Sequence, residues 1–150
     1  MSSPPANADS SDEALITTLV RNSRKITVVG ASRDPGKAAH QVPAALLAMG
    51  YGITPVNPSG GELLGQVVAP SLAQVSGPID LVDVFRPSAD AADITRQAIA
   101  VGARAVWLQL GIVCDEAAAL CAAAGVPFVQ NRCLLVEARR LMPSGRIPSL

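Results

Sequence analysis

The stretch Val28–Lys37 reads VVGASRDPGK and joins the apolar run Ile26–Val29 to a segment of helical pattern, Ala38–Met49. All four residues of the apolar run are β-branched, and the run is too short for a helix. Both features favour a strand that is buried on both faces. The glycine that ends the run is followed by small and turn-forming residues, so the stretch is expected to be a strand–loop–helix unit.

The same alternation continues along the chain and predicts a sheet of five parallel strands. The expected strands are Ile26–Val29, Ile53–Val56, Leu81–Phe85, Ala105–Leu108 and Phe128–Val129. The helical segments between them, Ala38–Met49, Ala89–Val101 and Asp115–Ala124, are each followed by a glycine suited to end a helix. Two more helices are expected over Asp12–Arg24 and Leu134–Leu141.

These elements predict an α/β fold: a Rossmann-like, doubly wound, parallel five-stranded sheet with helices on both faces. A single domain is expected over residues 12–142, with a disordered tail over residues 1–11 and another over residues 143–150. In the helix at 89–101, Ala91, Ile94, Ala98 and Val101 are expected to face the core, and Ser88 is expected to cap its start.

Composition excludes several classes of function. The 150 residues include 12 basic and 12 acidic side chains, so the chain lacks the positive field that a nucleic-acid partner requires. There is no apolar run of the length of a membrane span, and residues 1–11 do not read as a signal peptide. A cytoplasmic protein is therefore expected. Three cysteines without C-x-x-C spacing and a single histidine argue against a metal site or a disulfide framework.

A doubly wound sheet binds its ligand at the carboxyl ends of its strands, so the residues directly after each strand are informative. They are mostly small, polar or cationic: Gly30–Ser32, Asn57–Gly61, Arg86–Ser88, Gln109–Ile112 and Asn131–Cys133. The first loop can offer backbone N–H groups and the Ser32 hydroxyl to a phosphate, with Arg33 or Lys37 neutralising its charge. An anionic nucleotide is the expected ligand.

Missing features narrow the choice of nucleotide. Ser32 occupies the second glycine position of the G-x-G-x-x-G pattern, and no acidic residue follows the second strand to bind the ribose of NAD. Five residues separate Gly30 from Gly36, and Ala38 follows Lys37, so the loop is not a P-loop for ATP.

The set of loops resembles the CoA-binding domain of the succinyl-CoA synthetase alpha subunit, and more closely the small stand-alone CoA-binding proteins. The resemblance spans residues 26–141. It rests on five segments in order: VVGASRDPGKAAHQV at 28–42, ITPVNPSGGELLGQ at 53–66, IDLVDVFRP at 79–87, AVWLQLGI at 105–112 and NRC at 131–133.

The resemblance implies that coenzyme A lies across the carboxyl edge of the sheet. It implies phosphates near Gly30, Ala31 and Ser32, and the adenosine end near Val56, Asn57, Phe85, Arg86 and Pro87. It implies the pantetheine arm near Gln109 and Ile112, and the thiol end near Asn131 and Cys133. Pro58, in the loop after the second strand, is a further expected contact with the cofactor. The ligase carries a lysine in the loop after the second strand, and residues 57–62 here contain none. The 3′-phosphate would then depend on Arg33, Lys37 or Arg86.

No acyl-CoA ligase activity is expected of this chain alone, because the phosphorylated histidine of the ligase lies in a second domain. The leading hypothesis is a non-catalytic CoA-binding protein that acts as a carrier, sensor or regulatory partner. An NAD(P)-dependent or thiol-based oxidoreductase and a subunit of a larger ligase-type complex remain as alternatives, and a homodimer is a further possibility.

Other residues have simpler interpretations. Asp83, inside a buried run, is expected to be a hydrogen-bonded structural carboxylate, and Arg86 has Asp83 and Asp90 as alternative partners to a phosphate. Cys114, Cys121 and Trp107 are expected in the core. Cys133, at a strand-to-helix junction, is a candidate for a mixed disulfide with CoA.

Overall fold

Five strands form a parallel sheet in the computed structural model, which describes residues 10–148. They are β1 (Lys25–Val29), β2 (Gly52–Val56), β5 (Leu81–Val84), β6 (Val106–Leu108) and β7 (Phe128–Val129). Their order across the sheet is β2-β1-β5-β6-β7, and every neighbouring pair is parallel. The predicted fold class and all five predicted strands are confirmed, with bounds that shift by one residue at most.

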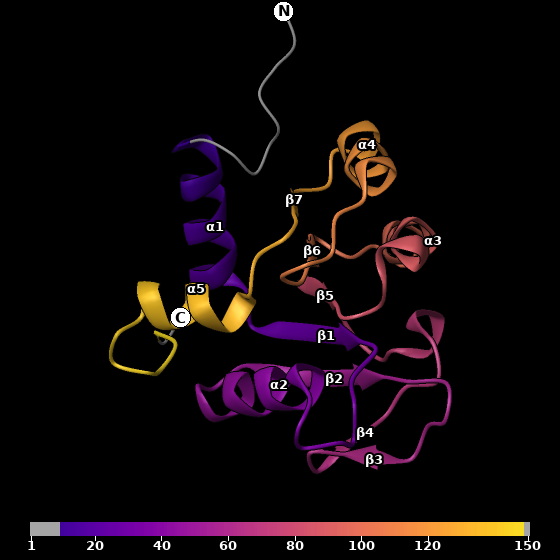
Figure 1. Ribbon diagram of the computed structural model, residues 1–150, viewed down its shortest axis with the longest axis vertical. Helices are drawn as coiled ribbons and strands as arrows, with labels where there is room; N and C mark the ends of the chain where they lie inside the picture. Colours follow the sequence, from indigo (N-terminus) through magenta and orange to yellow (C-terminus); the bar gives the residue numbers. More distant parts are fainter. Residues whose placement is uncertain (1–9, 149–150) are drawn as a thin grey trace, which may run out of the picture.

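Five α-helices cover the two faces of this sheet (Figure 1). They are α1 (Ser10–Asn22), α2 (Ala38–Ala48), α3 (Ser88–Ala100), α4 (Asp115–Ala124) and α5 (Leu134–Leu141). Buried residues of α1, α2 and α5 belong to one apolar cluster, and those of α3 and α4 belong to a second cluster on the other face. Because both faces are covered, the strands are mostly apolar, and all four residues of β5 are buried.

The topology creates a crevice between β1 and β5. The chain passes from β1 outward to β2, whereas from β5 it passes in the opposite direction to β6 and β7. The helices that follow β1 and β5, α2 and α3, therefore lie on opposite faces of the sheet. Their connecting loops separate at the carboxyl edge, where doubly wound sheets bind ligands.

Some sequence predictions need correction at the helix ends. The first helix covers Ser10–Asn22 and not residues 12–24. Ser88 is the first residue of α3 and not its cap, because its side-chain oxygen accepts a hydrogen bond from the N–H of Val113. Val101 is 38% exposed and does not continue the buried stripe of Ala91, Ile94 and Ala98.

The segment between β2 and β5 contains structure that the sequence does not announce. A short antiparallel hairpin joins β3 (Glu62–Leu63) to β4 (Gln66–Val67), and a 3₁₀ turn, η1, covers Leu72–Gln74. The hairpin turns through Leu64 and Gly65, both with positive φ. Leucine is unusual in that conformation, so the sequence lacks the Asn-Gly signal typical of such a turn.

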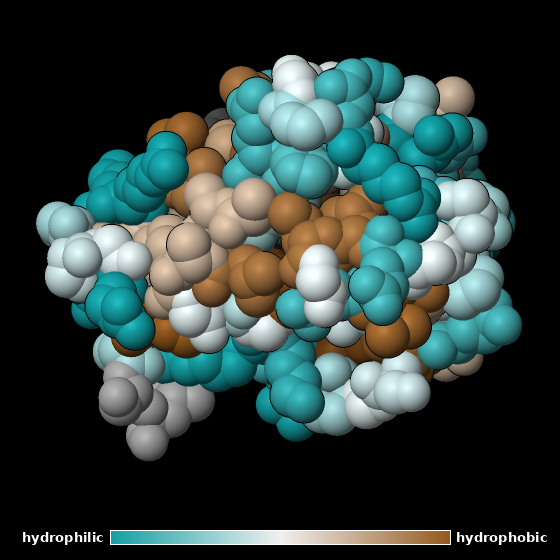
Figure 2. Space-filling model, turned by 90° about the horizontal axis from the view of Figure 1, so that it is seen from below, coloured by the Kyte–Doolittle hydropathy of each residue, from teal (hydrophilic) through white to brown (hydrophobic). Residues whose placement is uncertain are grey.

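The β3–β4 region lies on the face drawn in Figure 2, where apolar side chains gather in the middle of the view. Val67 of β4 is 77% exposed. At the opposite end of the chain, residues 143–148 contact the domain, although the sequence predicts a disordered tail. The N–H of Ile147 donates to the carbonyl of Met49 at 3.0 Å, and its side chain packs over Gly50.

Among residues 10–148, no helix combines the length and the apolar character needed to cross a membrane.

Candidate functional site

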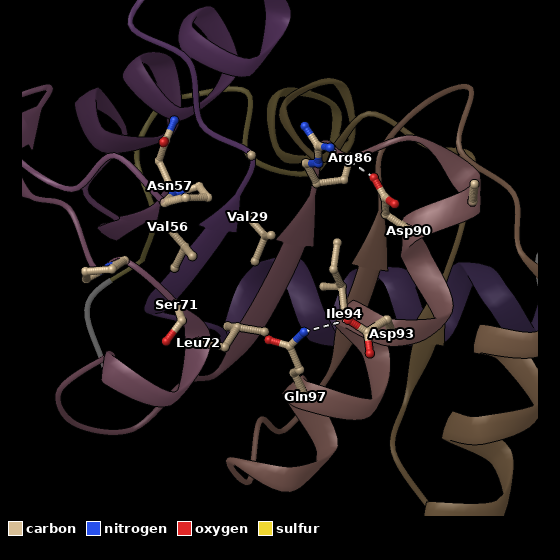
Figure 3. Close-up of a pocket in the computed structure, with 14 residues that line it drawn as sticks. Val29, Val56, Asn57, Ser71, Leu72, Arg86, Asp90, Asp93, Ile94 and Gln97 are labelled. Carbon is tan, nitrogen blue, oxygen red and sulfur yellow. Dashed lines mark hydrogen bonds and ion pairs between the residues drawn. The ribbon is translucent and has the colours of Figure 1, made fainter.

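A cavity of about 520 Å³ opens at the carboxyl ends of β1, β2 and β5 (Figure 3). Its wall is formed by the ends of the strands, the segment before and at the start of η1, and one side of α3. The lining residues are Val29, Gly30, Val56, Asn57, Pro58, Pro70, Ser71, Leu72, Arg86, Ala89, Asp90, Asp93, Ile94 and Gln97.

Five of the residues expected from the sequence line this cavity: Gly30, Val56, Asn57, Pro58 and Arg86. The other ten expected residues, including Arg33 and Lys37, are absent from its wall. The residues of α3 that line the cavity were not expected from the sequence. The only available signal was the spacing of the polar and apolar positions 90, 93, 94 and 97, which places them on one face of a helix.

Gly30 allows the close contact on which one end of the cavity depends. Its φ is +88°, a conformation that glycine adopts without steric cost. A Cβ atom at this position would lie 3.0 Å from Cδ of Arg86. The aliphatic part of Arg86 therefore packs directly on the backbone of Gly30, and the guanidinium is held at the junction of β1 and β5.

Arg86 has a carboxylate partner in this structure. Its Nη2 lies 3.0 Å from Oδ2 of Asp90, one turn further along the chain in α3. Both side chains are about half exposed, so the pair is in contact with solvent and adds little to stability. Asp90 thus occupies part of the coordination that an incoming anion would use.

The first turn of α2 holds the loop at residues 30–37 through two hydrogen bonds to Ser32. Pro43 lies inside α2 and has no N–H to offer to the carbonyl of Ala39, four residues earlier. That carbonyl accepts the N–H of Ser32 at 3.1 Å. Nδ1 of His40 lies 2.8 Å from the carbonyl of Ser32 and donates to it, since a carbonyl can only accept. The Ser32 amide is consequently engaged within the protein, whereas its hydroxyl can still donate a proton outward.

Arg33 connects this loop to the segment that follows β2. Its guanidinium donates to Oγ of Ser59 at 2.9 Å and to the carbonyl of Gly60. Asn57 completes the connection, because its Nδ2 donates to the carbonyl of Ala31 at 3.1 Å. Arg33 therefore holds two loops together at the edge of the cavity.

Four of the other expected residues follow β6 and β7: Gln109, Ile112, Asn131 and Cys133. Oε1 of the buried Gln109 accepts the N–H of Leu134 at 3.1 Å, and Oδ1 of Asn131 accepts the N–H of Gly111 at 2.8 Å. Trp107 is fully buried as expected, and its Nε1 donates to the carbonyl of Arg132 at 2.8 Å. The turn that carries Cys133 is thus tied to the loop after β6.

All three cysteines are free thiols. Cys121 is fully buried, and burial raises the pKa of its thiol to about 11. Cys114 is half-buried and caps α4, with its Sγ accepting the N–H of Ala117 at 3.4 Å. Cys133, also half-buried, directly precedes α5.

Asp83 differs from its expected role. It is fully buried in β5, between Val28 of β1 and Trp107 of β6. Neither of its carboxylate oxygens has a hydrogen-bond partner among the described residues, so the expected hydrogen-bonded carboxylate is wrong. Burial raises the pKa of Asp83 well above its ordinary value, because a charge is poorly solvated in the core.

Comparison with known proteins gives consistent matches over most of the chain. A family model described as a CoA binding domain matches residues 24–139. The uncharacterized protein YneT of Bacillus subtilis is 35% identical over 124 residues, which cover 83% of this chain and 92% of YneT.

Two solved structures share the whole architecture. The cell-free ID.343 protein of Thermus thermophilus superposes with a TM-score of 0.82 and 39% identity, over 87% of this chain and 98% of that chain. A hypothetical protein from Pyrococcus horikoshii OT3 superposes with a TM-score of 0.85 and 33% identity, over 95% of this chain and 99% of that chain.

Proposed function

This chain belongs to the CoA binding domain family, whose model covers residues 24–139 of its 150, and on that premise we propose that it binds coenzyme A or an acyl-CoA. The observation that carries the proposal is the cavity at the β1–β5 crevice, where Arg86 packs on Gly30. A cation beside a close backbone approach, at the carboxyl edge of a doubly wound sheet, suits a phosphorylated nucleotide.

In the proposed complex, the phosphates lie near Gly30, Ala31 and Ser32, with Arg86 as their nearest cation. The adenosine end enters the cavity beside Val56 and Asn57. From there the pantetheine arm runs along the carboxyl edge past the remaining expected residues, Gln109, Ile112, Asn131 and Cys133. This direction follows the order of the strands, since β6 and β7 lie beyond β5.

We further propose that the protein acts as a carrier, sensor or regulatory partner in the cytoplasm and does not catalyse a reaction. Three free thiols suit a reducing compartment. No pair of groups at the cavity is placed as a nucleophile with its base among the described residues, because its two acidic side chains are engaged with Arg86 and Gln97.

The test is a comparison of thermal stability with CoA, acetyl-CoA, 3′-dephospho-CoA, NAD and NADPH at equal concentration. A ligand at 100 times its dissociation constant adds about 2.7 kcal/mol, which raises Tm by several degrees in a domain of this size. We expect CoA and acetyl-CoA to stabilise the protein. A larger shift with NADPH would contradict the proposal in favour of an oxidoreductase, and no shift with any of the five would point to a missing partner subunit.

Replacing Asp90 with asparagine is expected to tighten CoA binding about two- to fivefold. The substitution removes the carboxylate that pairs with Arg86 and also removes its repulsion of the phosphates. Isothermal titration calorimetry at two salt concentrations would measure this. The gain should shrink at high salt, because both contributions are electrostatic, and a loss of affinity would show that Asp90 contacts the ligand favourably.

Cys133 is expected to form a mixed disulfide when the protein is incubated with CoA disulfide. The Cys133 thiolate attacks one sulfur of CoA disulfide, the S–S bond breaks, and one CoA thiolate leaves. Intact-protein mass spectrometry would detect one added CoA. The adduct should disappear in Cys133→Ser and persist in Cys114→Ser, whose thiol is also half-buried. The reverse pattern would place the thiol end of CoA at α4.

A further inference from the structure

The α3 side of the cavity presents two oxygen atoms as hydrogen-bond acceptors. Nε2 of Gln97 donates to Oδ2 of Asp93 at 2.9 Å (Figure 3). A carboxylate can only accept, so the amide must turn its nitrogen toward Asp93. The bond leaves Oδ1 of Asp93 and Oε1 of Gln97 as acceptors on the wall of the cavity.

Asp93 and Gln97 are exposed to solvent, and apolar side chains line the cavity beside them. Ile94 of α3 lies between the two polar residues in the sequence, and Leu72 faces it from η1. Val29 and Val56 form the floor at the ends of β1 and β2. All four side chains are buried or nearly so, with exposures of 2% to 8%. A flat, mostly apolar group that carries a hydrogen-bond donor on one edge is the chemical complement of such a wall.

The distribution of charge along the cavity also favours an uncharged group beside Asp93. Arg86 lies at the Gly30 end, whereas Asp93 lies about one and a half turns into α3 and has Gln97 as its hydrogen-bond partner. A phosphate near Asp93 would be repelled, since neither Asp93 nor Gln97 brings a positive charge. The cavity therefore favours a ligand whose anionic part lies by Arg86 and whose uncharged, donor-bearing part lies by Asp93.

We infer that Asp93, oriented by Gln97, recognises the exocyclic amine of adenine and so selects adenine nucleotides over those with an oxygen at that position. The inference rests on the proposed function and adds to it the group by which the base is read. The adenine amine carries two hydrogens and can donate to Asp93. Hypoxanthine has a carbonyl oxygen in the same place, which a carboxylate repels.

The test compares CoA with its hypoxanthine analogue by isothermal titration calorimetry on the full chain. Wild-type protein should bind CoA about tenfold more tightly, the effect of one hydrogen bond to a charged acceptor. Asp93→Ala should remove this preference. Asp93→Asn should reverse it, because an asparagine amide can donate to the hypoxanthine oxygen. A higher affinity of Asp93→Asn for the hypoxanthine analogue is a result that a purely structural role for Asp93 does not produce.

Asp90→Asn is the matched control, since it makes the same chemical change three residues earlier on the same helix. It should change the affinity for both ligands alike and leave their ratio near ten. Equal affinities in the wild type, or a ratio that survives in Asp93→Ala, would overturn the inference.

If the proposed function is wrong, the calorimetric experiment gives a different result from failure of the inference about Asp93. In that case CoA would not bind to the wild type, and ADP and IDP would be titrated by NMR on the side-chain amide of Gln97. Selective, saturable shifts with ADP would keep the cavity as an adenine site and reject CoA as its ligand. Equal responses to ADP and IDP, or none to either, would overturn the inference as well.

Discussion

Replacing Arg86 with alanine is expected to weaken CoA binding by about ten- to a hundredfold, which corresponds to the loss of 1.5–3 kcal/mol in hydrogen bonds to a charged group. Arg86 is the only cation on the wall of the cavity within residues 10–148. Its aliphatic part rests on Gly30, so its guanidinium is positioned before a ligand arrives. A preoriented cation loses less side-chain entropy on binding than a free one, which increases its share of the affinity.

The measurement is calorimetric titration with CoA and with 3′-dephospho-CoA. If Arg86 binds the 3′-phosphate, the substitution should weaken CoA much more than 3′-dephospho-CoA. Equal losses would assign Arg86 to the pyrophosphate. Arg96→Ala provides the control, because Arg96 lies on α3, the helix that follows Arg86, but pairs with Glu116 of α4 and does not line the cavity. Equal CoA affinity of Arg86→Ala and wild type, with both proteins folded, would contradict the proposed position of the phosphates.

The strands and the edge where the cavity opens could be predicted from the sequence because both depend on local signals. Runs such as Ile26–Val29 are apolar and β-branched, and each of the three helical segments ends at a glycine with positive φ, such as Gly125. Once the strands are parallel, the residues after them share one edge of the sheet. Gly30 and Arg86 could therefore be placed together although 56 positions separate them in the chain.

The α3 half of the cavity could not be predicted in the same way. Asp90 and Asp93 are typical of the first turns of any solvated helix, because acidic side chains interact favourably with the positive end of the helix dipole. Which side of α3 faces the crevice depends on how the helix packs against η1, and η1 has no sequence signal of its own. The position of Arg33 shows a related limit. Its charge suggested a phosphate contact, whereas its bonds to Ser59 and Gly60 depend on a loop whose path is not local.

For Asp83, burial could be predicted from the sequence, but the hydrogen bonding of its carboxylate could not. The apolar run around it correctly predicts that it is buried, because its neighbours in β5 are Val82 and Val84. Whether a buried carboxylate finds a donor depends on side chains from other strands. At this position those neighbours are Val28 and the ring of Trp107, whose only N–H donates to Arg132.

Replacing Asp83 with asparagine is expected to stabilise the protein at neutral pH, by an amount that grows with pH. Burial raises the pKa of Asp83 in the folded state above its value of 3.8 in the unfolded chain. Between these two pKa values the unfolded chain has released the proton and the folded protein has kept it. The free energy of unfolding therefore falls as pH rises through this window, by up to about 1.4 kcal/mol per pH unit. Asparagine does not titrate and is free of this loss.

Urea unfolding of wild type and Asp83→Asn from pH 4 to pH 8 would measure the effect. The difference between the two free energies should be smallest at pH 4 and should increase until the raised pKa is passed. Asp115→Asn is the control, since Asp115 is exposed in the first turn of α4 and its loss removes about 0.3–1 kcal/mol of interaction with the helix N-terminus. A difference between wild type and Asp83→Asn that stays constant with pH would show that the carboxylate has gained a partner in solution.

A second substitution separates the cost of charge from the cost of polarity at this position. Asp83→Leu removes both the titratable proton and the polar oxygens, whereas Asp83→Asn removes only the former and still buries an amide. An unsatisfied buried polar group costs about 1–3 kcal/mol. The free energy of unfolding of the leucine variant should therefore exceed that of the asparagine variant by about that amount at every pH. The free energies of unfolding of the two variants should change in parallel with pH. Both should diverge from that of the wild type, because only the wild type has a carboxyl proton at position 83 that is retained on folding. If leucine proves less stable than asparagine throughout, a donor must reach position 83, and the stability that it provides would outweigh the gain in apolar contact with Val28 and Trp107.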